Sequence, residues 1–193
     1  MYNEDSSFII RIIMKKAIVA ATLLSVAAMV HAAQNYADRK AHIVNVSPHV
    51  ELTQFTFSNE DRDRGRGLSS DTRFIANYSW KNTSQQPIIA LEIVMLKYDA
   101  FDERLIGSRF IVQGTNSANW SPLQPGQSSS DGSIGFRDED VYTGIAYVRR
   151  VRLSDGSVWR VDDSKLLQEL KKVAPSIRNP GNLAPDAKPP AKE

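Results

Sequence analysis

The chain has 193 residues, with 24 Lys and Arg against 22 Asp and Glu, so its formal net charge is only +2. This balance gives no electrostatic reason to expect nucleic acid or an anionic membrane as the main partner. There is no cysteine, which excludes disulfides, Cys-ligated zinc, iron–sulfur clusters and thiol nucleophiles. The folded part must therefore be held together by its hydrophobic core alone.

The first residues have the three-part pattern of a secretory signal. Met14-Lys15-Lys16 gives a basic start, 17–30 is an uncharged apolar run, and Val30-His31-Ala32 suits a signal peptidase. We therefore expect 1–32 to be a cleaved signal peptide translated from Met14, and the mature protein to be periplasmic or secreted.

An uncleaved membrane anchor is the alternative interpretation of the same region. The apolar run is shorter than the roughly 20 residues that a spanning helix needs. Extending it to 8–13 would place Arg11 and two lysines inside the membrane, where charge is costly. We expect no membrane span after processing.

After a polar lead at 33–41, the segment 42–174 consists of short runs with alternating apolar and polar residues, separated by turn residues. Several short strands at such spacing indicate an all-β sandwich or barrel. The clearest half-buried strand is 72–82, with four apolar side chains on one face: Phe74, Ala76, Tyr78 and Trp80. The segment 88–98 is apolar on both faces apart from Glu92 and Lys97, which predicts a central strand covered on both sides.

The other strands are predicted with weaker patterns. Candidates are 43–46, 50–57 with an irregularity in its middle, 105–112 and 133–136. Residues 59–71 and 113–131 are expected to be loops, and Trp120 is expected to cover one end of the core.

Two segments, 143–153 and 158–162, predict a hairpin across Asp155-Gly156, because Asp-Gly is a strong two-residue turn signal. Such a turn would place Arg152 opposite Trp159 as a cation–π pair and Arg149 opposite Asp162 as an ion pair. The apolar residues change parity along the first strand, which predicts a bulge near Arg149-Arg150.

The segment 163–173 is predicted to form a short helix. Asp163 or Ser164 would cap it, and the apolar stripe that docks it on the sandwich is Leu166, Leu167, Leu170 and Val173. Pro175 ends it. Proline, glycine and alanine dominate afterwards, so we expect 175–193 to be a disordered tail.

Three stretches carry a pattern of turns and core strands: the run 77–84 (Asn-Tyr-Ser-Trp-Lys-Asn-Thr-Ser), the turn Pro125-Gly126-Gln127-Ser128 and the run 151–159 (Val-Arg-Leu-Ser-Asp-Gly-Ser-Val-Trp). Together they resemble the small bacterial extracytoplasmic domains of the FxLYD type and their immunoglobulin-like relatives. The resemblance covers 50–161; in place of the Phe-x-Leu-Tyr-Asp run stands Met-Leu-Lys-Tyr-Asp at 95–99. It implies an immunoglobulin-like antiparallel β-sandwich of about seven or eight strands, here with one short C-terminal helix, often serving as a binding or accessory module.

No pattern of catalytic or metal-binding residues stands out. His42 and His49 are an odd number of residues apart in extended chain, so they should lie on opposite faces. No serine stands in a Gly-x-Ser-x-Gly elbow. The carboxylates at 102–103 and 138–140 are flanked by arginines and are interpreted as solvated turns. We therefore expect no enzyme activity, no cofactor and no metal.

The best candidate for a functional surface is basic. It combines the closing hairpin with the loops and comprises Arg149, Arg150, Arg152, Trp159, Arg62, Arg64, Arg66 and Trp120. The plainer interpretation is that these arginines only solubilise a sheet edge. The favoured function is an accessory or protein-interaction module of the bacterial envelope with an unidentified envelope partner; the alternative is a binder of a small ligand or cell-wall glycan. The sequence indicates no oligomeric state.

Overall fold

Alternating apolar side chains build the described part of this protein into two packed β-sheets. The computed structural model describes residues 39–62, 71–113, 121–136, 138, 140–181 and 183–184, with side chains for all of these except 60–62, 71–72 and 136. They hold eight strands and one helix and belong to one unit, Arg39–Glu193. The expected signal peptide lies outside the described residues, as does all of the expected lead before residue 39.

One sheet, here called sheet B, has three antiparallel strands in the order β2-β3-β6: β2 (Val50–Arg62), β3 (Asp71–Asn82) and β6 (Ser128–Phe136). The other, sheet A, has the order β1-β7-β4-β5, with β8 also paired to β7: β1 (Lys40–Val44), β4 (Ile88–Tyr98), β5 (Ser108–Gln113), β7 (Thr143–Leu153) and β8 (Val158–Arg160). The all-β sandwich is thus confirmed.

The facing sides of the two sheets form the main core. Phe74, Ala76, Tyr78 and Trp80 of β3 are all buried on one face, as their alternation predicts. Opposite them lie Leu91, Ile93 and Met95 of β4 and, beyond these, Val148 and Val151 of β7. The predicted irregularity in β2 is also present, as a register shift between Leu52 and Gln54.

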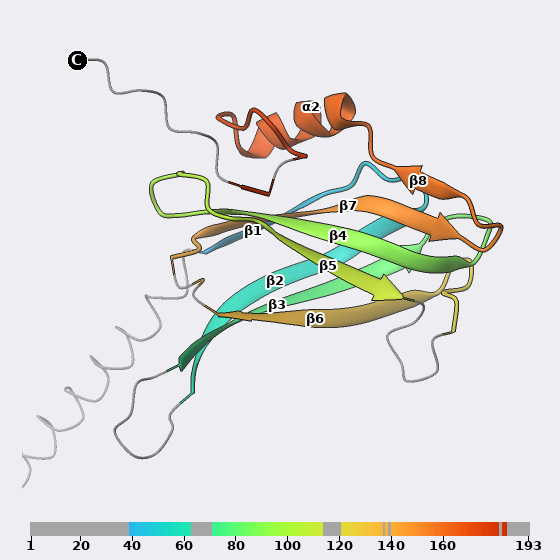
Figure 1. The fold of residues 1–193 in the computed structure, drawn as a ribbon, viewed down its shortest axis with the longest axis horizontal. Coiled ribbons are helices and arrows are strands. Elements are labelled where there is room, and N and C mark those ends of the chain that lie inside the picture. Colours follow the sequence, from blue (N-terminus) through green and yellow to red (C-terminus); the bar gives the residue numbers. More distant parts are fainter. Residues whose placement is uncertain are drawn as a thin grey trace, which may run out of the picture. The chain divides into compact units, whose positions relative to one another are not determined.

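Sheet A is buried on its other side as well, over part of its length. Helix α2 (Asp163–Val173) lies against this outer face, so the fold has three layers, sheet B, sheet A and α2 (Figure 1). The second core joins Leu166 and Leu170 of α2 to Val94, Leu96 and Tyr98 of β4 and to Ile145 and Tyr147 of β7. The prediction that β4 is covered on both sides is therefore confirmed.

Several boundaries differ from the predicted ones. Strand β2 continues to Arg62 and β6 begins at Ser128, so both run into segments expected to be loops, while β5 begins only at Ser108. These ends are polar, yet β3 pairs with both strands, from Arg62↔Asp71 to Lys81↔Ser128. Backbone pairing along a long partner extends strands beyond their apolar residues. The first strand, β1, runs parallel to β7, so sheet A is mixed.

Asn82, at the end of β3, joins two of the turns on which the family resemblance rests. Its side-chain amide donates to the carbonyls of Gln86 and Leu123, at 2.9 Å each, and its Oδ1 accepts the backbone N–H of Ser84 at 2.8 Å. Its own carbonyl accepts the N–H of Gly126 at 2.9 Å. Asn82 is fully buried, and these bonds satisfy its polar groups, as burial demands.

The helix and the chain after it depart from the sequence prediction. The N-cap is Asp162, one residue earlier than expected, and its carboxylate accepts the N–H groups of Ser164 and Lys165. A disordered tail starting at residue 175 is wrong for 175–181, because this segment packs on sheet A. Ile177 is buried there, and the hydroxyl of Tyr147 donates to the carbonyl of Pro180 at 2.8 Å. Residues 185–193 lie outside the described part.

Two buried tyrosines make the fold sensitive to alkali. Burial raises the pKa of Tyr147 to about 12, partly opposed by the nearby charge of Arg149, and burial raises the pKa of Tyr78 to about 12. Between pH 10 and 12 the unfolded chain therefore binds fewer protons than the folded protein, and stability must fall as pH rises.

We expect the free energy of unfolding to drop by roughly 1 kcal/mol per pH unit for each tyrosine in this range. Urea unfolding at pH 9, 10 and 11 would measure it. Tyr78→Phe should remove about half of the slope, because it removes one of the two titrating hydroxyls. The variant should still fold, because this hydroxyl makes only a 3.9 Å contact with the Met95 sulfur and a bond to Ser133. An unchanged slope in this variant would contradict the assignment.

Candidate functional site

The closing hairpin does not have the predicted two-residue turn. Leu153 N–H donates to the carbonyl of Ser157 at 3.0 Å, so the loop has three residues, Ser154-Asp155-Gly156. Gly156 has a φ of 86°, the left-handed conformation that ends a three-residue loop of this kind. The register therefore shifts by one residue, and the observed pairs are Arg152 with Val158, Val151 with Trp159 and Arg150 with Arg160.

This register overturns two predicted contacts. Trp159 shares the inner side of sheet A with Val151, where it packs on the main core and meets the ring of His49 edge-on at 6.0 Å. Arg152 lies on the outer side and therefore cannot form the expected cation–π pair with it. The predicted ion pair between Arg149 and Asp162 is also absent. In the observed register the carbonyl of Arg149 accepts the N–H of Val161, and the carboxylate of Asp162 caps α2.

The predicted bulge in β7 is confirmed, and it decides which side chains face outward. The register with β4 passes from Val148↔Ile93 to Arg150↔Glu92, which leaves Arg149 as the extra residue. Before the bulge, Ile145 and Tyr147 face α2. After it, Val151 and Leu153 face the main core, so that Arg150 and Arg152 point outward. Without the extra residue the arginines would enter the core.

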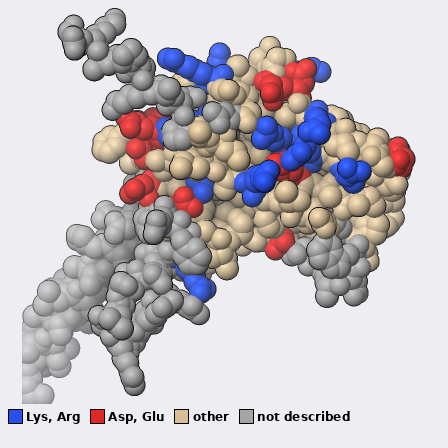
Figure 2. Space-filling view, viewed as in Figure 1, with Lys and Arg blue, Asp and Glu red and all other residues tan. Residues whose placement is uncertain are grey.

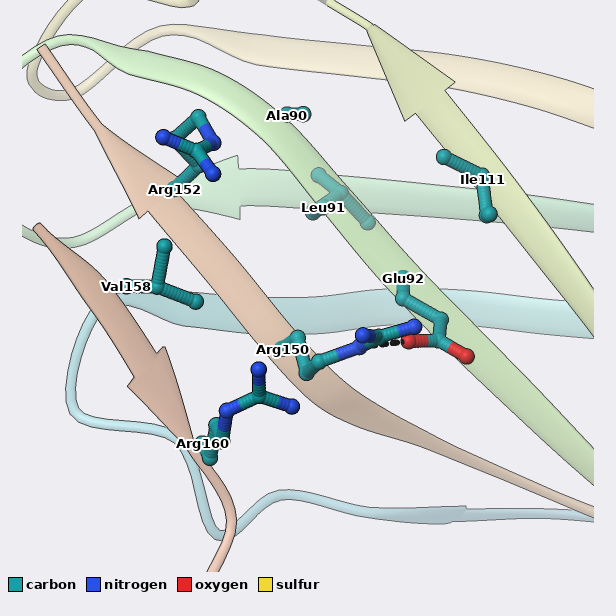
Figure 3. Close-up of a pocket in the computed structure, with 8 residues that line it drawn as sticks. All are labelled: Ala90, Leu91, Glu92, Ile111, Arg150, Arg152, Val158 and Arg160. Carbon is teal, nitrogen blue, oxygen red and sulfur yellow. Dashed lines mark hydrogen bonds and ion pairs between the residues drawn. The ribbon is translucent and has the colours of Figure 1, made fainter. Parts of the chain in front are cut away.

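The outward arginines surround a shallow hollow of about 180 Å³ on β4, β5, β7 and β8 (Figure 3). Its residues are here called the arginine face: Ala90, Leu91, Glu92, Ile111, Arg150, Arg152, Val158 and Arg160. Ala90 pairs with Arg152 of β7 and with Gln113 of β5. Its short side chain leaves the space between the longer side chains that surround it.

Glu92 and Arg150 form an ion pair at the centre of this face. Arg150 Nε donates to Glu92 Oε2, the interaction drawn in Figure 3. The side chain of Glu92 is only 4% exposed and that of Arg150 is 36% exposed. The hydrogen bond and charge of Glu92 raise the pKa of Arg150, so Arg150 stays protonated at any physiological pH. Arg150 thereby compensates a carboxylate that would otherwise be buried alone.

The rest of the arginine face is positive and partly apolar. Figure 2 shows Lys and Arg side chains gathered over β7, β8 and their neighbours, with acidic atoms among them. Among described residues, the side chain of Arg160 forms no hydrogen bond or ion pair, and that of Arg152 donates only a 3.3 Å bond to the carbonyl of Gly156. Ile111 is 50% and Val158 39% exposed. Exposed branched side chains beside unpaired guanidinium groups are typical of interaction surfaces.

The structure assembles only part of the predicted basic surface. Arg150 and Arg152 lie together, but Arg149 points to the C-terminal segment, where its guanidinium approaches Gly181. The backbone of Arg62 is at the end of β2. Arg64, Arg66 and Trp120 lie outside the described residues.

Sequence reasoning missed several members of the arginine face, notably Arg160, Glu92 and Ala90. A signal for Arg160 was present, because a three-residue loop at Ser-Asp-Gly aligns it with Arg150. Glu92 was visible as an acid inside an apolar strand, but its partner depends on the bulge. Nothing in the sequence marks Ala90, whose importance comes from being smaller than its neighbours.

The two expected carboxylate clusters contain residues whose surroundings are described. Asp138 is bound by Lys97 Nζ at 2.8 Å, and this lysine also lies over the ring of Phe74 at 5.1 Å. Asp102 belongs to an exposed turn with a φ of 59°. Among the described residues, no group of three or more His, Asp or Glu side chains is placed to hold a metal ion. Nor is any helix in that part of the chain long and apolar enough to cross a membrane.

A second, larger hollow of about 670 Å³ lies between the end of α2 and the starts of β1 and β7. Its cations have contacts already: Lys172 pairs with Glu169 at 2.6 Å, and Lys40 lies over the ring of Tyr142 at 5.9 Å. The arginine face therefore offers the stronger unsatisfied charge.

No model of a known protein family matches the sequence, and no curated protein matches it either. Solved structures that are similar include a hypothetical protein from Peptoclostridium difficile 630, with 14% identity over 66% of this chain and 92% of that one, at a TM-score of 0.43. Another is the Northeast Structural Genomics Consortium target SoR45, with 13% identity over 58% and 80% of the two chains and a TM-score of 0.38. Likeness at this level indicates no function.

Removing one charge of the ion pair on the arginine face should cost more stability than removing both. We expect Arg150→Met to lower the free energy of unfolding by about 3 kcal/mol at pH 7, because Glu92 stays buried without a counter-charge.

Urea unfolding at pH 7 would measure this loss. Adding Glu92→Gln to Arg150→Met should recover most of the lost stability at pH 7, since no buried charge remains. A double variant as unstable as Arg150→Met alone would contradict this account of the pair.

Proposed function

We propose that this chain is a non-enzymatic binding module of the bacterial envelope that acts through its arginine face. The observation that carries the proposal is the unequal covering of sheet A. One half of its outer side is covered by α2 and Ile177, while no described residue covers the other half, which presents Arg152, Arg160 and exposed branched side chains. A surface with this composition suits an acidic partner.

The chemistry of the arginine face favours binding over catalysis. Its one carboxylate, on Glu92, is engaged by Arg150, and its remaining charged groups are arginines, which stay protonated and cannot act as bases. General acid–base work needs a group that can exchange a proton near neutral pH. The residues of this face offer none.

At the arginine face, the size of the hollow favours a protein partner over the alternative, a small ligand or a glycan. About 180 Å³ is below the roughly 300–1,000 Å³ that small-molecule sites usually enclose. Sugars also favour exposed aromatic faces, whereas Trp159 lies on the inner side of the sheet. A protein segment could cover the whole face and use the hollow for a single side chain.

The envelope location rests on the sequence of the first 32 residues, whose basic start and apolar run are typical of a secretory signal. Kinship with the immunoglobulin-like domains of the FxLYD type belongs to the same proposal. It is supported by the buried Asn82, which holds the asparagine–serine turn and the Pro-Gly turn against each other.

Photocrosslinking tests the proposal because it captures a partner whatever its identity. A photoreactive amino acid replacing Val158, in protein expressed in its host, should give one discrete crosslinked species. Arg152→Glu together with Arg160→Glu should reduce its yield at least tenfold, because the charge that attracts the partner is reversed.

The matched control reverses two exposed lysines that do not belong to the arginine face, Lys81→Glu on β3 and Lys165→Glu on α2, and should leave the yield unchanged. A photoreactive group replacing Lys81 should capture nothing specific. Equal loss in both charge-reversal variants, or no species from position 158, would overturn the proposed function.

A further inference from the structure

The hollow of the arginine face has an apolar floor and a positive rim. Ala90 lies at the bottom, Ile111 and Val158 form apolar walls, and the guanidinium groups of Arg152 and Arg160 stand at the border (Figure 3). An apolar centre with a charged border is the usual anatomy of a site that takes one anchoring side chain.

The volume of the hollow limits the anchor to one side chain. A cavity of about 150 Å³ in a protein core binds benzene, and this hollow measures about 180 Å³. One phenyl ring or one large aliphatic side chain fits that space. A ring seated there would also lie beside guanidinium groups, an arrangement that the negative faces of aromatic rings favour.

The charges of the rim define what flanks the anchor. Arg150 is neutralised by Glu92, whereas Arg152 and Arg160 have no acidic partner among the described residues. Two uncompensated guanidinium groups can bind two carboxylates, each in a forked pair of hydrogen bonds. Residues flanking the anchor should therefore be Asp or Glu.

We infer that the arginine face binds an acidic peptide segment of a partner protein, in which one bulky apolar side chain fills the hollow above Ala90 and flanking carboxylates pair with Arg152 and Arg160. This rests on the proposed function and adds the chemistry of the partner. Ion pairs at a surface contribute little by themselves, so the apolar anchor is what should separate this partner from any other polyanion.

Synthetic peptides can serve as the probe. The first carries a fluorescent label and one phenylalanine with two aspartates or glutamates on each side; the second has alanine in place of phenylalanine; the third has lysines in place of the acids. Titrated with the full chain and followed by fluorescence anisotropy, the first should bind at least tenfold more tightly than the second, and the third should not bind. Raising the salt concentration should weaken the first.

Variants locate the binding. Ala90→Leu fills the hollow without changing charge and should weaken the first peptide at least fivefold while leaving the second unchanged. Ile111→Ser is a second test in case Ala90→Leu disturbs the strand. It removes an apolar wall of the hollow and should also weaken binding of the first peptide. Arg152→Gln with Arg160→Gln should weaken both peptides, whereas Lys81→Gln with Lys165→Gln should weaken neither.

Each other outcome decides against the inference. Equal affinity for the phenylalanine and alanine peptides would show a plain anion site without an anchor, and tighter binding of an acidic uronic-acid oligosaccharide would show a glycan site. If no peptide binds but crosslinking at position 158 persists and depends on the arginines, the inference fails and the proposed function stands. If both are absent, both fail.

Discussion

The extra residue at Arg149 is the constraint on which the rest of this structure depends. Strand β7 has to serve two different environments on the outer side of sheet A, and a regular strand cannot change parity. The bulge lets Ile145 and Tyr147 face α2, and then lets Val151 and Leu153 face the main core a few residues later. The same shift sends Arg150 and Arg152 outward, so the core and the candidate site are determined together.

The two halves of the outer side of sheet A are stabilised by different interactions. Over the first half, Leu166, Leu170 and Ile177 bury an apolar surface, with each fully buried aliphatic side chain contributing about 1.5–3 kcal/mol. Over the second half, Glu92 is buried only because Arg150 pairs with it. An uncharged pair of similar size would pack there at least as stably.

The sequence predicted the features that depend on local alternation and failed on those that depend on distant contacts. The apolar face of β3, the double-sided burial of β4 and the bulge in β7 all follow from the parity of neighbouring residues. The hairpin register was wrong because Asp-Gly occurs in turns of two and of three residues, and the choice depends on pairing by Ser157. The tail at 175–181 has a disordered composition, yet Ile177 and Pro180 are held by side chains far away in the chain. Arg160 and Ala90 become part of a site only once the register is known.

Arginine-specific labelling in intact cells tests the central claim, that the arginine face is the covered surface of this protein in its natural setting. Phenylglyoxal labelling, read by mass spectrometry, would be compared between the purified chain and the chain in its own envelope, with the exposed Arg178 as the internal reference. The account predicts that Arg152 and Arg160 are labelled in the purified chain and protected in the envelope, while Arg178 reacts equally in both. Equal labelling of all three arginines in the two settings would contradict it.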